Sequence, residues 1–161
     1  MKQGIQELAP EDLECAASMG YRVKHLGIAR RTEQGIEMRV HPTLIPERKQ
    51  IATVDGVLNA VMILGDAVGE LVLVGPGAGG AATASSVCAD LVDVARNPAC
   101  SGSALGIAAD ALQSPTWVPA EDIASEWYVR VTATDQSGVM SDITKILASR
   151  DISIESIIQK P

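Results

Sequence analysis

The glycine-rich run from Gly75 to Gly80 constrains the fold more than any other stretch of this sequence. It lies between an apolar strand-like segment and a predicted helix from Thr83 to Arg96, and it matches the pattern G-x-G-x-x-G. That pattern is typical of a strand–loop–helix unit that binds a dinucleotide, but the unit also needs a second parallel strand with an acidic residue at its end. Neither follows here, because a segment rich in Ala, Ser, Gly and Pro begins at Asn97. The run is therefore either a tight turn or a loop that contacts a nucleotide held mainly by another region.

A helix is predicted near the N-terminus. Pro10, Glu11 and Asp12 provide the proline and the acidic side chains that favour a first helical turn. The apolar face of this helix would be formed by Leu13, Ala16 and Ala17, and Gly20 would end it.

A hairpin is predicted next, with one strand from Tyr21 to Arg30. The second strand shows regular alternation of apolar and polar residues from Ile36 to Val40, and Gly35 supplies the positive φ that the turn needs. Pro42 and Pro46 then predict an interruption, because proline cannot donate to the ladder of a central strand.

A second hairpin is predicted from Leu58–Leu64 and Glu70–Val74, and its apolar runs favour a sheet covered by helices. In the helix that follows, Val87, Leu91 and Val94 lie on one face.

The last part of the chain predicts a linker and then a small unit. Residues 97–125 contain several breakers, and one short helix is predicted within them near Ala104–Leu112. Beyond the linker, Trp127–Thr134 and Ile152–Ile158 are predicted strands on either side of a helix at Ser137–Ser149. The predicted fold class is therefore α+β, with a strand-rich sheet, covering helices and a small β-α-β unit.

Charge and composition exclude several classes of protein. A formal net charge of −7 argues against nucleic-acid binding. The apolar runs are shorter than the roughly 20 residues needed to span a bilayer, and the first residues lack the apolar stretch of a signal peptide, so a cytoplasmic protein with no membrane contact is expected. The three cysteines and the histidines His25 and His41 have no metal-site spacing, so no metal is expected.

Several segments resemble homoserine dehydrogenase in order and spacing. They are Gly20–Ala29, Val40–Pro46, Val54–Val61, Gly65–Gly69, Gly75–Gly79, Thr83–Val87 and Asp90–Ala95. The resemblance covers about residues 4–96 and resumes at 126–160. It implies three regions: residues 1–96 from the substrate domain with its glycine-loop helix, a linker at 97–125, and a regulatory region at 126–161.

The regulatory region resembles the first half of an ACT domain, a small ferredoxin-like module that senses amino acids. Its signature segments are Asp135–Met140, Asp142–Leu147 and Ile152–Glu155. Because backbone N–H groups at a helix start can receive a carboxylate, this resemblance implies an effector site with threonine as a possible ligand. The implied contact residues are Asp135, Gln136, Gly138 and Val139.

The family resemblance implies NAD(P)-dependent interconversion of aspartate semialdehyde and homoserine, in threonine, methionine and isoleucine biosynthesis. It places Gly77, Ala78 and Gly79 near the cofactor, NADP or NAD. It places no catalytic residue in this chain, because no position here matches the family's catalytic lysine and acidic residues. Lys24 lies in a strand but has no support from the family motif.

The chain is therefore expected to be a C-terminal part of the enzyme, inactive without an N-terminal nucleotide-binding domain. Apolar faces left uncovered favour a homo-oligomer. Two alternatives stay open: an amino-acid-sensing module without catalysis, and a subunit that assembles with a separate nucleotide-binding chain.

Overall fold

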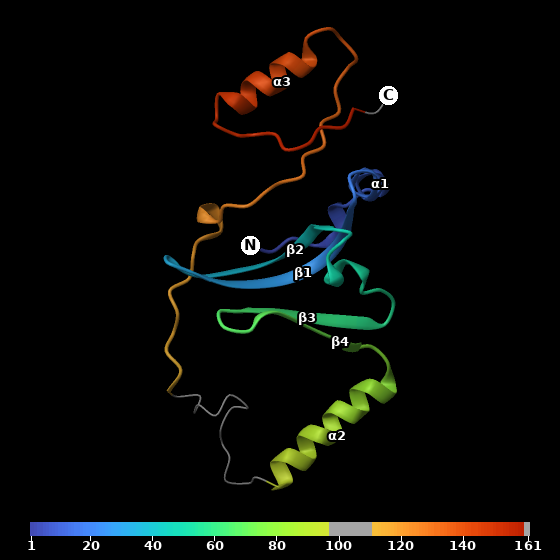
Figure 1. Cartoon of the computed structure of the whole chain (residues 1–161), viewed down its shortest axis with the longest axis vertical. Helices are drawn as coiled ribbons and strands as arrows, with labels where there is room; N and C mark the ends of the chain where they lie inside the picture. The colour runs from blue at the N-terminus through green and yellow to red at the C-terminus, as the bar shows by residue number, and fades with distance from the viewer. Residues whose placement is uncertain (97–110, 160–161) are drawn as a thin grey trace.

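The computed structural model describes residues 1–96 and 111–159 and has an α+β fold (Figure 1). Two antiparallel hairpins lie between helix α3 at one end of the molecule and helix α2 at the other. The elements in chain order are η1 (Ile5–Glu7), α1 (Pro10–Ser18), β1 (Tyr21–Thr32), β2 (Gly35–Pro46), η2 (Gln50–Thr53), β3 (Leu58–Gly65), β4 (Gly69–Pro76), α2 (Gly80–Arg96), η4 (Ala120–Asp122) and α3 (Val139–Ala148). The short helix predicted near Ala104–Leu112 lies almost entirely outside the described residues.

The first hairpin is longer than the sequence predicted. Strands β1 and β2 pair from Tyr21 opposite Pro46 to Thr32 opposite Gly35. The predicted interruption at Pro42 is wrong, because β2 continues through it to Pro46. The sheet has only two strands, so each is an edge strand, where the missing N–H of proline need not enter the ladder.

The outer edge of β2 receives two segments that are distant in the sequence. Lys2 forms a parallel bridge with Val40, and Trp117 forms one with Ile36. The N–H of Ile36 donates to the carbonyl of Thr116 at 2.8 Å, and the N–H of Val118 donates to the carbonyl of Ile36 at 3.0 Å. Part of the predicted linker is thus docked on the first hairpin.

The second hairpin forms where the sequence predicted it, but no residue of β3 or β4 is buried. The strands form two separate two-stranded sheets rather than one sheet covered by helices. Among the described helices, α1 packs on β1, whereas β3 and β4 expose large apolar side chains such as Val61 and Leu73.

Helix α1 buries Ala16 of its predicted face, but not Leu13 or Ala17. Asp12 and Ala16 are buried and Cys15 is half-buried, whereas Leu13 is 48% exposed and Ala17 is exposed. This face adjoins the small apolar core, which contains Ala16, Ile45, Ala52 and Val118.

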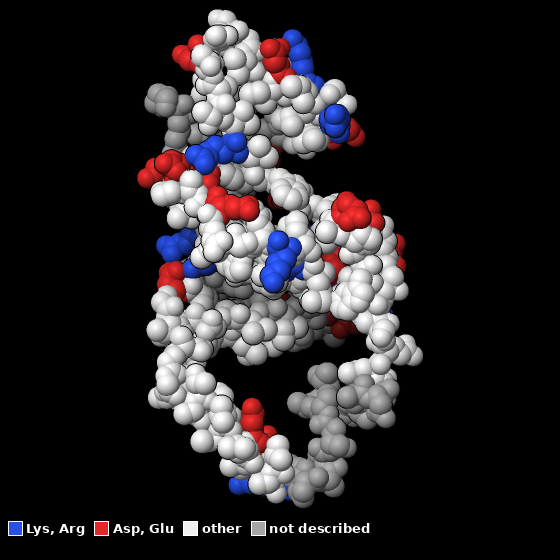
Figure 2. Space-filling view, turned by 180° about the vertical axis from the view of Figure 1, so that it is seen from behind, with Lys and Arg blue, Asp and Glu red and all other residues white. Residues whose placement is uncertain are grey.

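Helix α2 begins at Gly80, three residues before the predicted start. Its predicted apolar face is open to solvent: Val87, Leu91 and Val94 are 52%, 65% and 71% exposed. Figure 2 shows α2 as an arm with few charged side chains on this face of the molecule. None of the helices in the described ranges is both long and apolar enough to cross a membrane.

The second region, residues 126–159, contains the predicted helix, α3, but the segments on either side of this helix are not paired strands. Trp127–Thr134 and Ile152–Ile158 form no ladder with any other segment of the described chain. A strand is defined by its hydrogen-bonded neighbours, so an apolar alternation without a partner strand leaves the backbone unpaired.

Candidate functional site

The predicted nucleotide loop is a short connection between β4 and α2, and it is fully exposed. Gly79 has a φ of +113°, which favours glycine strongly over any residue with a Cβ. The backbone N–H and the hydroxyl of Thr83 both donate to the carbonyl of Gly79, at 3.1 and 3.0 Å. These bonds fix the loop at the first turn of α2, where the leading N–H groups of a helix have no partner within it.

Gly77 is held in place from the other side by strand β3. Its N–H donates to the carbonyl of Val57 at 3.1 Å. A Cβ at position 77 would lie 2.6 Å from Cγ of Asn59, so this side chain would have to move to admit a larger residue. Asn59 is paired with Gly75 across the hairpin. Asn59 was not among the predicted site residues, although an amide inside the apolar run of β3 was a visible signal.

Asn59 also lines a cleft between the two hairpins. The cleft has a volume of about 190 Å³ and is lined by β1, η2, the η2–β3 connection and the start of β3. Lys24 and His25 lie on its wall from β1, opposite Asn59 and Ala60 from β3. A larger groove of about 360 Å³ lies elsewhere, beside Met1 on the first hairpin, and its lining is largely apolar.

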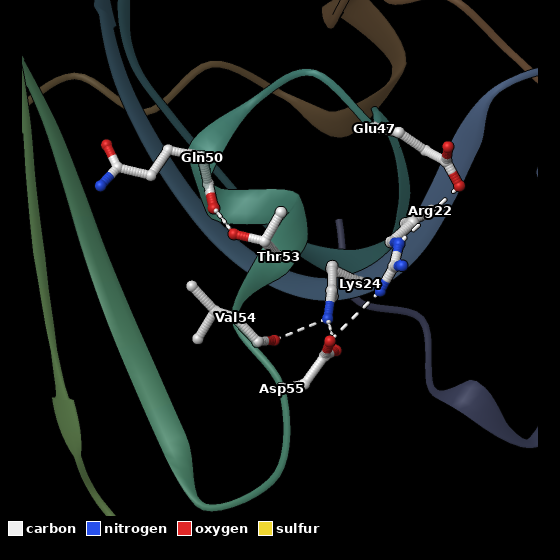
Figure 3. Close-up of polar contacts among 7 residues, drawn as sticks. All are labelled: Arg22, Lys24, Glu47, Gln50, Thr53, Val54 and Asp55. Atoms are coloured by element: carbon white, nitrogen blue, oxygen red, sulfur yellow. Dashed lines mark hydrogen bonds and ion pairs between the residues drawn. The ribbon is translucent and has the colours of Figure 1, made fainter.

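Lys24 is part of an ion-pair cluster that joins β1 to the η2–β3 connection (Figure 3). Its Nζ atom donates to the carbonyl of Val54 and to Oδ1 of Asp55, both at 2.6 Å. Arg22 donates to Oδ2 of Asp55 at 3.2 Å and lies 3.8 Å from Glu47. The hydrogen bond from Lys24 is the main cause that holds the pKa of Asp55 below its usual value. The Lys24 ammonium thus already donates to two acceptors, which favours a structural role for this side chain over a catalytic one.

The predicted effector residues lie at the start of α3. Gly138 has a φ of +98° and caps this helix, and Val139 is its first residue. The N–H of Asp142 donates to the carbonyl of Gly138 at 3.0 Å. Asp135 and Gln136 precede this turn and are exposed. Asp135, Gln136 and Gly138 are exposed and Val139 is half-buried, so the four residues lie together in a turn at the start of a helix.

The histidines do not form a common site with other potential ligands. Nε2 of His25 contacts the carbonyl of Gln3 at 3.1 Å, and Nδ1 of His41 lies 2.8 Å from the carbonyl of Pro42. Within residues 1–96 and 111–159, no three His, Cys, Asp or Glu side chains come together as metal ligands would.

Comparison with known proteins identifies two family patterns in this chain. Residues 1–92 match the homoserine dehydrogenase family, and residues 127–161 match the ACT domain family. The homoserine dehydrogenase of Pseudomonas aeruginosa is 50% identical over 162 residues, and that of Neisseria gonorrhoeae is 44% identical over 162 residues. Each alignment covers 98% of this chain and 37% of the relative.

A solved structure has a similar fold. The homoserine dehydrogenase of Thiobacillus denitrificans superposes with a TM-score of 0.81 at 44% sequence identity. The superposition covers 98% of this chain and 37% of the other. The 161 residues thus span little more than a third of the length of the proteins that they match.

Proposed function

The chain belongs to the homoserine dehydrogenase family, and from this premise we propose that it forms part of an enzyme that interconverts homoserine and aspartate semialdehyde with NAD(P). In this proposal the chain supplies one wall of the cofactor site. The nucleotide fold and the catalytic lysine and acidic residues come from a region that these 161 residues do not contain.

The observation that carries this proposal is the exposed loop Gly77–Gly79 at the start of α2. Neither Gly77 nor Gly79 carries a side chain, and the space around Gly79 is open, so a bound molecule can approach the backbone closely there. The leading N–H groups of α2 can donate to a negatively charged group there. These features fit a dinucleotide, which would supply the hydride acceptor and donor when bound.

The chain's own residues would orient and enclose the cofactor rather than exchange protons with the substrate. Asn59 sets the position of Gly77, and the Thr83 bonds set the position of Gly79. The Lys24–Asp55 cluster holds β1 against the η2–β3 connection and thereby keeps the cleft beside Asn59 in shape. A substitution that breaks any of these contacts should alter the apparent affinity for the cofactor more than the rate of hydride transfer.

The test is an NADPH fluorescence titration of this chain, alone and mixed with the part of the Pseudomonas aeruginosa enzyme that it does not match. We expect no saturable binding alone, and homoserine-dependent reduction of NADP in the mixture. Gly79→Ala should weaken the mixture's NADP affinity, whereas Gly69→Ala should not. Gly69 is a matched control, because it also has a positive φ, +74°, and open space around it, but lies in the β3–β4 turn. Tight binding by the chain alone would contradict the proposal.

The ACT match supports a second candidate function, the sensing of an amino acid by residues 127–161. The turn at Asp135, Gln136, Gly138 and Val139 would receive the ligand's carboxylate. Threonine should then raise the melting temperature of this chain by mass action on the folded state. An unchanged melting temperature at millimolar threonine would count against an effector site in these residues.

A further inference from the structure

The buried carboxylate of Asp12 joins two parts of the chain that are far apart in sequence. Its Oδ1 atom accepts the hydroxyl of Tyr128 at 3.0 Å and Nε of Arg130 at 2.8 Å, across a separation of 116 residues to Tyr128. Its Oδ2 atom accepts the backbone N–H of Ala9 at 2.9 Å. One side chain thus starts helix α1 and also binds the segment that leads into α3 (Figure 1).

Burial makes this contact more than a surface ion pair. The residue is only 8% exposed, and a buried carboxylate needs partners to replace its lost water. The bond from Ala9, followed by those from Tyr128 and Arg130, holds the pKa of Asp12 below its usual value. Burial, the bond to Asp12 and the neighbouring thiol of Cys15 raise the pKa of Tyr128 well above that of a free tyrosine.

The polar contacts between residues 126–159 and residues 1–96 are concentrated at helix α1. Among the hydrogen bonds and ion pairs of the described residues, those at Asp12 join residues 126–159 to residues 1–96, and the thiol of Cys15 on the same helix also faces Tyr128. The chain reaches this point from Val118, which is itself docked on β2, and continues from Arg130 to the turn at Gly138. The turn at Gly138 is therefore joined by a short stretch of chain to a segment that is held at α1.

We propose that Asp12, Tyr128 and Arg130 form a latch that couples residues 126–159 to helix α1. When these contacts break, both residues 126–159 and helix α1 become less stable. The docking surface is the first turn of α1, and its partner is the extended segment 127–130. The latch follows from contacts within this chain and does not depend on the dehydrogenase activity or on cofactor binding.

Hydrogen–deuterium exchange of the 161-residue chain tests the latch. Tyr128→Phe and Arg130→Met remove one donor each and leave the Ala9–Asp12 bond intact. We expect roughly tenfold faster exchange, about 1.4 kcal/mol of opening free energy, both in the hydrogen-bonded amides of helix α3 and in those of helix α1. Exchange in the β3–β4 hairpin should stay unchanged, which shows that the variants fold.

Two matched controls should leave exchange in both helices unchanged. Tyr21→Phe alters the other tyrosine, which lies in β1, and Arg31→Met alters an exposed arginine that forms none of the ion pairs in the described part of the chain. Faster exchange on only one side of the contact, or on neither, would overturn the coupling.

The ionisation of Tyr128 provides a second readout. In a Tyr21→Phe background, Tyr128 is the remaining tyrosine, so tyrosinate absorbance reports it alone. It should ionise at a higher pH than a free tyrosine, and Asp12→Asn should lower that pH. A Tyr128 that ionises like a free tyrosine would show that the latch is open in solution and would overturn the proposal.

Discussion

Replacement of Gly77 by alanine tests how the glycine loop is held. The added methyl would lie 2.6 Å from Cγ of Asn59, far inside normal contact distance. Gly77 is not among the glycines with positive φ, so the backbone itself tolerates alanine. Asn59 cannot retreat as a whole, because β3 pairs with β4 at this position, opposite Gly75. The entire cost of the substitution therefore comes from one pair of side chains.

The expected cost is that of overpacking, about 1–3 kcal/mol. For a chain of this size, about 1 kcal/mol lowers the melting temperature by roughly 2–4 °C, so Gly77→Ala should lower it by about 2–12 °C. Asn59→Ala alone should change the stability by less than about 0.5 kcal/mol, because the residue is exposed. The double variant should regain most of the loss, with a coupling energy of about 1–2 kcal/mol.

Thermal unfolding of the four proteins, followed by circular dichroism, gives this coupling energy. Gly79→Ala is the contrasting variant, because its methyl meets open space but its φ of +113° strains any residue with a Cβ. Asn59→Ala should therefore rescue Gly77→Ala and leave Gly79→Ala unrescued. Additive effects at Gly77 and Asn59, or rescue of both glycine variants, would refute the reasoning.

Three further predictions concern other parts of the chain. The pKa of Asp12 is lowered in the folded state, so its stabilising effect is present above the unfolded value of about 3.9 and is lost as the pH falls through the folded value. Asp12→Asn should thus destabilise the chain by about 1–3 kcal/mol at neutral pH, and the difference from wild type in urea unfolding should vanish in strong acid. Leu91→Lys with Val94→Lys should reduce concentration-dependent self-association in sedimentation, because both side chains are more than half exposed on α2; an already monomeric wild type would contradict this. Gly138→Ala should cost about 1–2 kcal/mol in thermal unfolding, since its φ of +98° strains any side chain.

The hairpins could be predicted from the sequence because their signals are local. Glycines such as Gly35 and Gly69 supply the positive φ of each turn, and the flanking residues alternate over a few positions. The error at Pro42 has a different origin. Whether a strand is central or at an edge depends on segments that lie far away in the sequence, and only a central strand excludes proline.

The same limit explains what the sequence analysis missed at α1 and in the second region. Leu13 was expected to be buried because it is apolar, yet the buried face belongs to Asp12, whose partners Tyr128 and Arg130 lie more than a hundred residues away. The segment 127–134 has strand-like alternation, but it pairs with no strand in the described part of the chain. Local pattern thus predicts what a segment can form, and contact partners decide what it does form.

The exposed surface of β3, β4 and α2 includes both the proposed cofactor-binding loop and the apolar face that a partner region would cover. The buried residues belong to α1, the first hairpin, η2 and Val118, whereas β3, β4 and α2 have none. The exposed glycine loop lies between β4 and the exposed apolar face of α2. A partner region that covers Leu91 on α2 would therefore also bring its surface close to Gly79. Leu91→Lys should then impair assembly of the reconstituted enzyme, whereas Gly79→Ala should leave assembly intact and weaken the cofactor affinity, so the two roles of this surface can be separated.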